Sequence, residues 1–237
     1  MSDAIQIAHT AFDRANLEDG GHGVDEPVFA NVYDMLLAGM ATATVDGVGY
    51  LIFRGQLDSR WELVPSSRRT QPPRSELLRY SAVNGQIAYL QQKYPLIDLS
   101  TLTPEQREAV AQHYFSETEL LDFTDSMLIA AFFASDPSAI AMAELPPTGA
   151  VYRISRSDLE SLGVATVEAP ELPPEFTRIH RQQGLFIHVK HHTVINQRAL
   201  FERWVFRHQP LALPFEWPAL GIAAAQLLDD RIGAAGV

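Results

Sequence analysis

The segment Tyr50–Gln56 contains the residue types of an anion-binding strand end. Tyr50–Phe53 is a run of aromatic and branched residues that predicts a short buried strand, with Arg54 and Gly55 at its exit. A guanidinium binds phosphate through two parallel hydrogen bonds and stays charged when partly buried. A glycine beside it lets the backbone come close to a ligand. The segment, with Gln56 directly after it, is therefore the first candidate site.

Asp122 and Thr124 form a second polar group, just before an apolar run that begins near Ser126. Asp122 could contact a ligand, or it could hold Arg54 in an ion pair that fastens two segments together. Thr124 could likewise contact a ligand or serve as the N-cap of the helix that starts near Ser126. Both interpretations stay open for each residue.

His113, Tyr114 and Gln183 complete the candidate residues. His113 could act as a general acid or base, although a histidine near a helix end often bonds a carbonyl instead. The ring of Tyr114 could stack on a flat ligand. Gln183 precedes Gly184 and is either a ligand contact or a turn former. Its amide can bond a hydroxyl group but cannot act as a carboxylate base.

A histidine cluster near the third candidate does not predict a metal site. His188 and His192 would share one face of a strand, whereas His191 would point to the other face. No nearby acidic residue completes a ligand set. We expect no bound metal.

The hydrophobic periodicity predicts an α+β protein rather than a doubly wound sheet, because helices and strands do not alternate regularly. Pro27 suits a first helical turn, and Thr103 and Pro104 predict a capped helix start. The expected helices span residues 4–15, 27–40, 75–92, 103–114, 126–135 and 199–206. The expected strands span residues 50–53, 61–64, 150–154 and 185–189.

Composition narrows the classes of partner. The chain has 237 residues, a net charge of −11 at pH 7 and no cysteine. The acidic balance gives no strong indication of nucleic-acid binding. We find no run of roughly 20 apolar residues for a membrane span and no basic leader followed by an apolar block. These features lead us to expect a cytoplasmic protein that does not bind membranes.

Three blocks in the same order resemble the FRG family, named for its Phe-Arg-Gly motif. They are residues 50–56, residues 111–134 with the Ala111-Gln112-His113-Tyr114 and Leu120–Thr124 motifs, and residues 178–186 with Gln182-Gln183-Gly184. The resemblance covers about residues 50–189 and implies an FRG domain over 46–237. Residues 1–45 would then be a helical extension packed on its core.

A more distant likeness is to the ADP-ribosyltransferases, which implies a mixed sheet core with flanking helices and NAD as substrate. In that likeness Arg54 would anchor the pyrophosphate, Thr124 would orient the ribose, and Tyr114 or Tyr152 would stack on a ring. Gly55, Gln56, His113 and Asp122 would complete the nucleotide site. Gln183 stands where such enzymes carry a glutamate. The chain would transfer ADP-ribose to an unidentified macromolecule or hydrolyse it, and a role in toxicity or phage defence follows only by analogy.

Two other functions stay open. The same fold could be a non-catalytic ligand-binding or regulatory module, which the amide at Gln183 favours. A nucleic-acid-associated protein is the third possibility, supported only by the arginines Arg68, Arg69 and Arg74.

Overall fold

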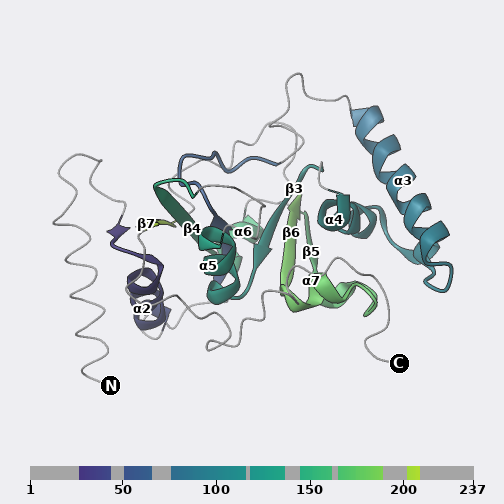
Figure 1. Ribbon diagram of the computed structural model, residues 1–237. Coiled ribbons are helices and arrows are strands. Elements are labelled where there is room, and N and C mark those ends of the chain that lie inside the picture. The colour runs from purple at the N-terminus through teal and green to yellow at the C-terminus, as the bar shows by residue number, and fades with distance from the viewer. Residues whose placement is uncertain are drawn as a thin grey trace. The chain divides into compact units, whose positions relative to one another are not determined.

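The computed structural model describes residues 27–43, 51–65, 76–115, 118–136, 145–161, 165–188 and 202–208. Within them the chain contains seven strands and six α-helices, so the expected α+β class is confirmed (Figure 1). Two compact units are formed by discontinuous stretches of the chain. Unit 1 contains residues 1–61, 124–161 and 197–224, and unit 2 contains residues 62–123, 162–196 and 225–237.

Unit 1 is built on four strands in the order β1-β7-β4-β2. β1 pairs with β7 in parallel, whereas β7 pairs with β4 and β4 with β2 in antiparallel fashion, so the sheet is mixed. The strands are β1 (Val28–Phe29), β2 (Leu51–Gln56), β4 (Thr148–Ser155) and β7 (Glu202–Arg207). The helices are α2 (Val32–Ala43), α5 (Met127–Ser135) and α6 (Arg156–Ser161).

Helices α2 and α5 lie on one face of these strands (Figure 1). α5 is apolar almost throughout, and Ser126 caps it by accepting from the amide of Ile129 (3.3 Å). The face of the strands that α5 covers carries Trp204, whose ring centroid lies 5.6 Å from that of Phe29. Side chains alternate along each strand, so every second residue of β2, β4 and β7 points to the opposite face.

Unit 2 packs helices against a smaller group of strands. Strands β5 and β6 pair in antiparallel fashion from Ala165↔His188 to Glu168↔Leu185. Val83, Ile87 and Leu90 of α3 contribute its core, with Val110 of α4. The elements are α3 (Glu76–Lys93), α4 (Pro104–Phe115), β3 (Leu120–Thr124, whose last residue belongs to unit 1), β5 (Ala165–Glu168), α7 (Thr177–Arg181) and β6 (Gly184–His188).

The predicted start of α4 is confirmed in detail. The amide of Gln106 donates to Thr103 Oγ1 (3.2 Å), and the amide of Thr103 donates to Gln106 Oε1 (3.0 Å). This reciprocal pair is a capping box, which satisfies two amides that the helix itself leaves unbonded. Helix α4 therefore presents His113 and Tyr114 from its last turn.

The largest error concerns residues 199–206, predicted to be a helix. Glu202–Arg207 is instead strand β7, which pairs with β4 along its whole length. The sequence Glu-Arg-Trp-Val-Phe has aromatic and branched residues that suit a strand, and pairing with a distant strand decides between the two forms. Residues 199–201 lie outside the described part, as does the expected helix 4–15.

Two further predictions are wrong: the expected helix 27–40 was started too early, and the expected strand 61–64 is not formed. Residues 27–31 are not helical, because Val28–Phe29 pairs with β7 and the amide of Val205 donates to the Pro27 carbonyl (3.1 Å). Helix α2 starts at Val32, after Asn31, whose Oδ1 accepts from the amide of Asp34 (2.9 Å). The expected strand 61–64 is not formed: the amide of Trp61 donates to the Asp58 carbonyl (3.1 Å) and that of Val64 to the Glu62 carbonyl (2.9 Å), which are turn contacts and not strand pairing.

Candidate functional site

Arg54 lies inside strand β2, not at its exit as predicted, because β2 extends to Gln56. The register places Arg54 opposite Tyr152 of β4, and Tyr152 opposite Arg203 of β7. Residues directly opposite in antiparallel strands point to the same face. Arg54, Tyr152 and Arg203 therefore form one row across three strands, and we call it the arginine row.

The arginine row lies on the face of the unit 1 strands that points away from α5. Residues of the α5 face, such as Gly55 and Trp204, alternate with the row along β2 and β7. Arg54 and Arg203 are partly exposed, whereas Tyr152 between them is 7% exposed. Two strand spacings put the two arginine backbones roughly 10 Å apart. Two long guanidinium side chains can converge over that distance on one ligand.

A hydrogen bond holds Arg203, at one end of the arginine row, in place. The Nη1 of Arg203 donates to the Ser59 carbonyl (2.9 Å), in the turn that follows β2. Gln56 lies two residues beyond Arg54, on the same face, and is 3% exposed. The buried ring of Tyr152 has little surface left for stacking on a ligand, so it acts as a spacer between the two arginines.

Gly55 contacts helix α5. A Cβ at this position would lie 1.9 Å from the carbonyl oxygen of Ala130 and 2.9 Å from the amide nitrogen of Ala134. The absence of a side chain thus lets the backbones of β2 and α5 touch. This packing accounts for a glycine beside Arg54 without any ligand.

Thr124 pairs with Phe53 across β2 and β3, which places its side chain on the face opposite Arg54. Its Oγ1 accepts from the amide of Ser126 (3.1 Å). The N-cap of α5 is Ser126 and not Thr124. Thr124 thus fixes the turn that leads into the capped helix.

His113 lies in unit 2 among aromatic rings. Its ring meets that of Phe186 edge-on, with centroids 6.1 Å apart, and that of Tyr114 at 5.5 Å. Its Nε2 is buried and has no hydrogen-bond partner in the structure as described. Burial, and after it the positive charge of Arg178, lowers the pKa of His113 from 6.5 to about 3. The imidazole is therefore neutral at pH 7.

This depressed pKa predicts a loss of stability in acid. Between pH 6.5 and about 3 the unfolded chain binds the proton that folded His113 refuses, so the free energy of unfolding falls as the pH falls. The expected slope is about 1.4 kcal/mol per pH unit relative to His113→Gln, which cannot titrate. Denaturant unfolding of both proteins at several pH values measures the difference. Parallel curves for the two proteins would refute the assignment.

Asp122 belongs to a hydrogen-bonded group inside unit 2. Its Oδ2 accepts from Gln112 Nε2 (3.1 Å), and Thr118 Oγ1 donates to Gln112 Oε1 (2.5 Å). Leu120 donates its amide to Thr118 (3.2 Å), which ties the group to the start of β3. These contacts support a structural role for Asp122 in linking α4 to β3.

Gln183 is exposed and occupies the left-handed region, with φ 48°. Its amide donates to the His180 carbonyl (3.0 Å), which closes the turn between α7 and β6. Positive φ in a residue other than glycine is uncommon and is found in turns and at functional sites. The turn-forming interpretation of Gln183 thus has a direct geometric basis.

The expected convergence of Arg54, Thr124 and Gln183 joins residues of both units and stays a prediction.

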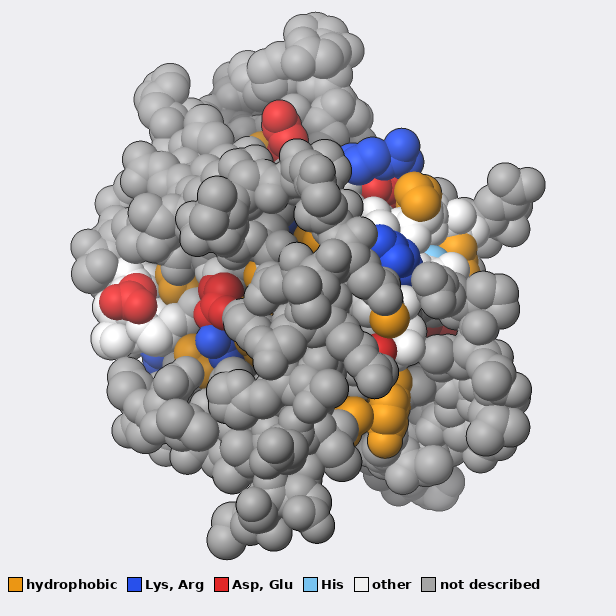
Figure 2. Space-filling model, turned by 90° about the vertical axis from the view of Figure 1, so that its left-hand side faces the viewer, with side chains coloured by type: hydrophobic (Ala, Val, Ile, Leu, Met, Phe, Trp, Pro, Cys, Tyr) orange, Lys and Arg blue, Asp and Glu red, His pale blue; other side chains and the backbone are white. Residues whose placement is uncertain are grey.

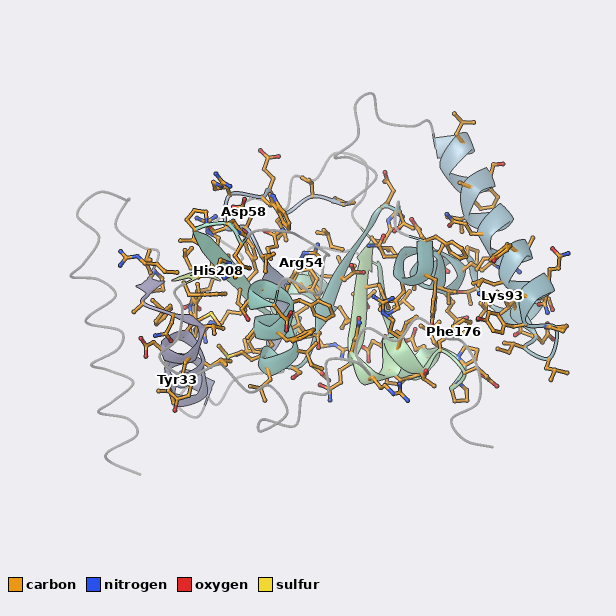
Figure 3. All side chains as sticks on the ribbon, in the orientation of Figure 1. Tyr33, Arg54, Asp58, Lys93, Phe176 and His208 are labelled. Atoms are coloured by element: carbon orange, nitrogen blue, oxygen red, sulfur yellow. The ribbon has the colours of Figure 1, made fainter. Side chains whose placement is uncertain are left out.

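Ser59, His208 and Asp58 have the residue types of a hydrolase triad but not its connections. Asp58 is bound in bidentate fashion by Arg60, a contact that lowers the pKa of its carboxyl group. The Nε2 of His208 bonds the Leu57 carbonyl (2.8 Å), and Ser59 Oγ bonds a threonine hydroxyl (2.6 Å). Asp58 and His208 lie close together (Figure 3), but each has its own hydrogen-bond partner, Arg60 or the Leu57 carbonyl, in the segment that follows β2. The triad chemistry requires serine bonded to histidine.

Neither the charged side chains on the face shown in Figure 2 nor the metal-binding groups of the described residues add a further site. In Figure 2 the acidic and basic side chains that are coloured lie interspersed and form no continuous basic block. No group of three or more histidine and acidic residues in the described ranges could hold a metal ion. His191 and His192 lie outside those ranges. None of the helices described is both long and apolar enough to cross a membrane.

Sequence reasoning missed Arg203 and Arg178. Arg203 was hidden by the helix expected over 199–206, although alternation through Trp204 and Phe206 could have indicated a strand. Arg178 was part of a family block but not a candidate residue; its charge helps to lower the pKa of His113, which lies 65 positions earlier, and no local pattern connects the two.

Comparison with known proteins supports one part of the resemblance. The sequence profile of the FRG domain matches residues 49–140. This range contains the Phe53-Arg54-Gly55 motif and the His113–Thr124 block, and it ends before Gln183. No curated protein and no solved structure matches the chain.

Proposed function

We propose that this chain binds NAD through the arginine row and transfers ADP-ribose to an acceptor or hydrolyses it. The observation that carries the proposal is the register that puts Arg54 and Arg203 on one face, with Tyr152 between them. Two guanidinium groups suit the two phosphates of a dinucleotide, because each fork binds two oxygens of a phosphate. The FRG-domain match over residues 49–140 includes Arg54.

The reaction requires little from the protein beyond binding and orientation. The bond between ribose C1′ and nicotinamide breaks, and its electron pair leaves with neutral nicotinamide. The electron-poor ribose carbon then takes an oxygen of water or of an acceptor, whose proton passes to the solvent. Arg54 and Arg203 would hold the pyrophosphate while this happens, so that binding energy positions the ribose.

A non-catalytic NAD-binding module is the second candidate, and Gln183 favours it. Its amide cannot accept the acceptor's proton, and its backbone already closes a turn. Such a module would bind NAD by the same arginines without releasing nicotinamide.

The test compares wild type with Arg54→Met, which keeps a long apolar stem and removes the charge. Calorimetry with NAD measures binding, and labelled NAD follows nicotinamide release with and without a cell extract. We expect Arg54→Met to weaken NAD binding by about tenfold or more, the loss of a charge-assisted phosphate contact. Release should fall in parallel.

The outcomes separate the candidates. Binding without release in the wild type supports the module over the enzyme. Absence of NAD binding by the wild type refutes both, as does binding that Arg54→Met leaves unchanged.

A further inference from the structure

We propose that a second copy of this chain binds to the outward face of helix α3, so that two α3 helices pack in antiparallel fashion across a two-fold axis. Helix α3 belongs to unit 2 and shares no residue with the arginine row, so the inference does not depend on NAD binding. The exposure, the charge and the shape of one helix face support it.

The two faces of α3 have different surroundings. Val83, Ile87 and Leu90 lie in the core of unit 2, and helix α4 packs against α3 (Figure 1). The opposite face is exposed, and we call it the outer stripe. Its residues follow one another at the three- and four-residue spacing of a single helix face. They are Leu78, Ser81, Gly85, Ala88, Tyr89 and Gln92.

The outer stripe is apolar in part and carries no charge. All of its residues are uncharged, although 20% of the residues of the whole chain are charged. A helix that faces water usually presents its charged residues on that side. Leu78 and Tyr89 are 61% and 53% exposed, and Leu96, just beyond the end of the helix, is 99% exposed. Exposed apolar groups that gather in this way mark an interaction surface.

Gly85 makes a hollow in the outer stripe. It lies near the middle of α3, where glycine is less favourable than alanine by about 1 kcal/mol. Nothing lies within 4 Å of the position of its Cβ, so packing inside the chain does not account for the glycine. Tyr89 follows one turn later, and its ring meets that of Phe115 edge-on, with centroids 6.1 Å apart. A hollow and a positioned ring thus lie one helical turn apart on the same face.

A second copy supplies the shape that fits this face. If a two-fold axis passes midway between Gly85 and Tyr89, the ring of each Tyr89 lies over Gly85 of the other copy, because the axis applies the same contact in both directions. The antiparallel arrangement also places the oppositely charged ends of the two helix dipoles side by side.

Charge favours the same partner. The chain has a net charge of −11, so two copies repel each other, and uncharged faces are where this repulsion opposes contact least. A basic partner would be favoured by acidic residues, and the outer stripe contains none. An identical uncharged face is therefore the better match.

The size of the face predicts a weak dimer. Helix α3 has 18 residues and is therefore about 27 Å long and about 10 Å across. With Leu96 included, two copies would bury roughly 1,000 Å² in total, which is the lower limit of a specific interface. We therefore expect a dissociation constant in the micromolar range, so that monomer and dimer can both be observed.

Sedimentation velocity of the full chain, at concentrations from about 1 µM to about 1 mM, tests the proposal. We expect the wild type to pass from monomer to dimer over this range. Tyr89→Glu should raise the dissociation constant by about tenfold or more, because it removes a central tyrosine and adds a negative charge near the axis in both copies. Tyr33→Glu on helix α2 is the matched control: it replaces another tyrosine that is 50% exposed and adds the same charge, and it should leave the dimer unchanged.

Gly85→Glu is a second variant, and it removes no side chain. Glutamate favours a helix more than glycine does, so the monomer should remain folded. The new side chain fills the hollow with a charge, and the dissociation constant should again rise by about tenfold or more. At concentrations well below the dissociation constant the chain is monomeric, and substitutions of Gly85 then affect only the helix itself.

Engineered disulfides test the orientation, because the chain has no cysteine of its own. Ala88→Cys lies next to the proposed axis and should give a cross-linked dimer on oxidation. The two copies of Leu78→Cys would be about 27 Å apart along the helices, beyond the reach of a disulfide, and should not cross-link.

Three results would overturn the proposal. The first is a wild type that stays monomeric up to about 1 mM, which would leave the outer stripe to a different partner. The second is a dimer that Tyr89→Glu and Gly85→Glu do not weaken, or that Tyr33→Glu weakens equally. The third is efficient cross-linking through Leu78→Cys, which would refute the antiparallel arrangement.

Discussion

Gly55→Ala should lower the free energy of unfolding by about 3 kcal/mol or more, at the upper end of the cost of overpacking a core. The added Cβ would lie 1.9 Å from the oxygen of Ala130 and 2.8 Å from its carbonyl carbon. These are backbone atoms of α5 and cannot rotate away, so the helix itself must shift. Phe132, which is 0% exposed, would lose its packing when α5 moves.

Denaturant unfolding, followed by circular dichroism, measures this loss. For a chain of this size the melting temperature should fall by roughly 10 °C. Gly85→Ala on α3 is the matched control, because nothing lies within 4 Å of its Cβ position and the residue is exposed. That substitution should stabilise the protein by up to about 1 kcal/mol, since alanine favours helix over glycine. A Gly55→Ala protein as stable as the wild type would contradict the close approach of β2 and α5.

The side chains of the Phe-Arg-Gly motif are divided between the two faces of strand β2. Its glycine lies on the face that packs against α5, and its arginine lies on the opposite face, in the arginine row. Phe53 shares the packed face with Gly55 and is 8% exposed. One strand segment thus serves helix packing with two of its three residues, and only the third, Arg54, lies on the face of the proposed NAD site.

Local chemistry explains which elements could be predicted from the sequence. The start of α4 was predictable because Thr103 and Gln106 satisfy each other's amides within four residues. Helix α5 was predictable from its continuous apolar run after Ser126. In both cases the determining contacts lie within one helical turn, so neighbouring residues contain the information.

Strand β7 and the arginine row could not be predicted in that way. Residues 202–207 become a strand by pairing with β4, about 50 positions earlier, and a single sequence does not show that pairing. The same register decides that Arg203, and not Arg153, shares a face with Arg54. Candidate residues named by type alone therefore included Arg54 but not its partner in the row.

Arg203→Met should weaken NAD binding about as much as Arg54→Met, by roughly tenfold or more, whereas Arg153→Met should leave it unchanged. Arg153 is the adjacent residue to Tyr152 on β4, and its side chain points to the other face, where it pairs with Glu202 and lies 4.5 Å from the Trp204 ring. All three variants remove one positive charge and keep a long stem. The net charge therefore changes equally in the three variants, which differ only in the sheet face that loses an arginine.

In Arg153→Met the stability of the fold should fall while the affinity for NAD stays unchanged. Arg153→Met loses an ion pair whose arginine is 13% exposed and a stacking contact with Trp204, so it should be less stable than the wild type. It should nevertheless bind NAD normally in calorimetry at a temperature where it is folded. Equal loss of affinity in the Arg153 and Arg203 variants would show that only overall charge matters, and the arginine row would then have no specific role.

The double variant Arg54→Met/Arg203→Met tests whether the two arginines bind the same ligand group. If both guanidiniums hold one pyrophosphate, the two losses of binding free energy should not be additive, because contacts to a shared ligand group are coupled.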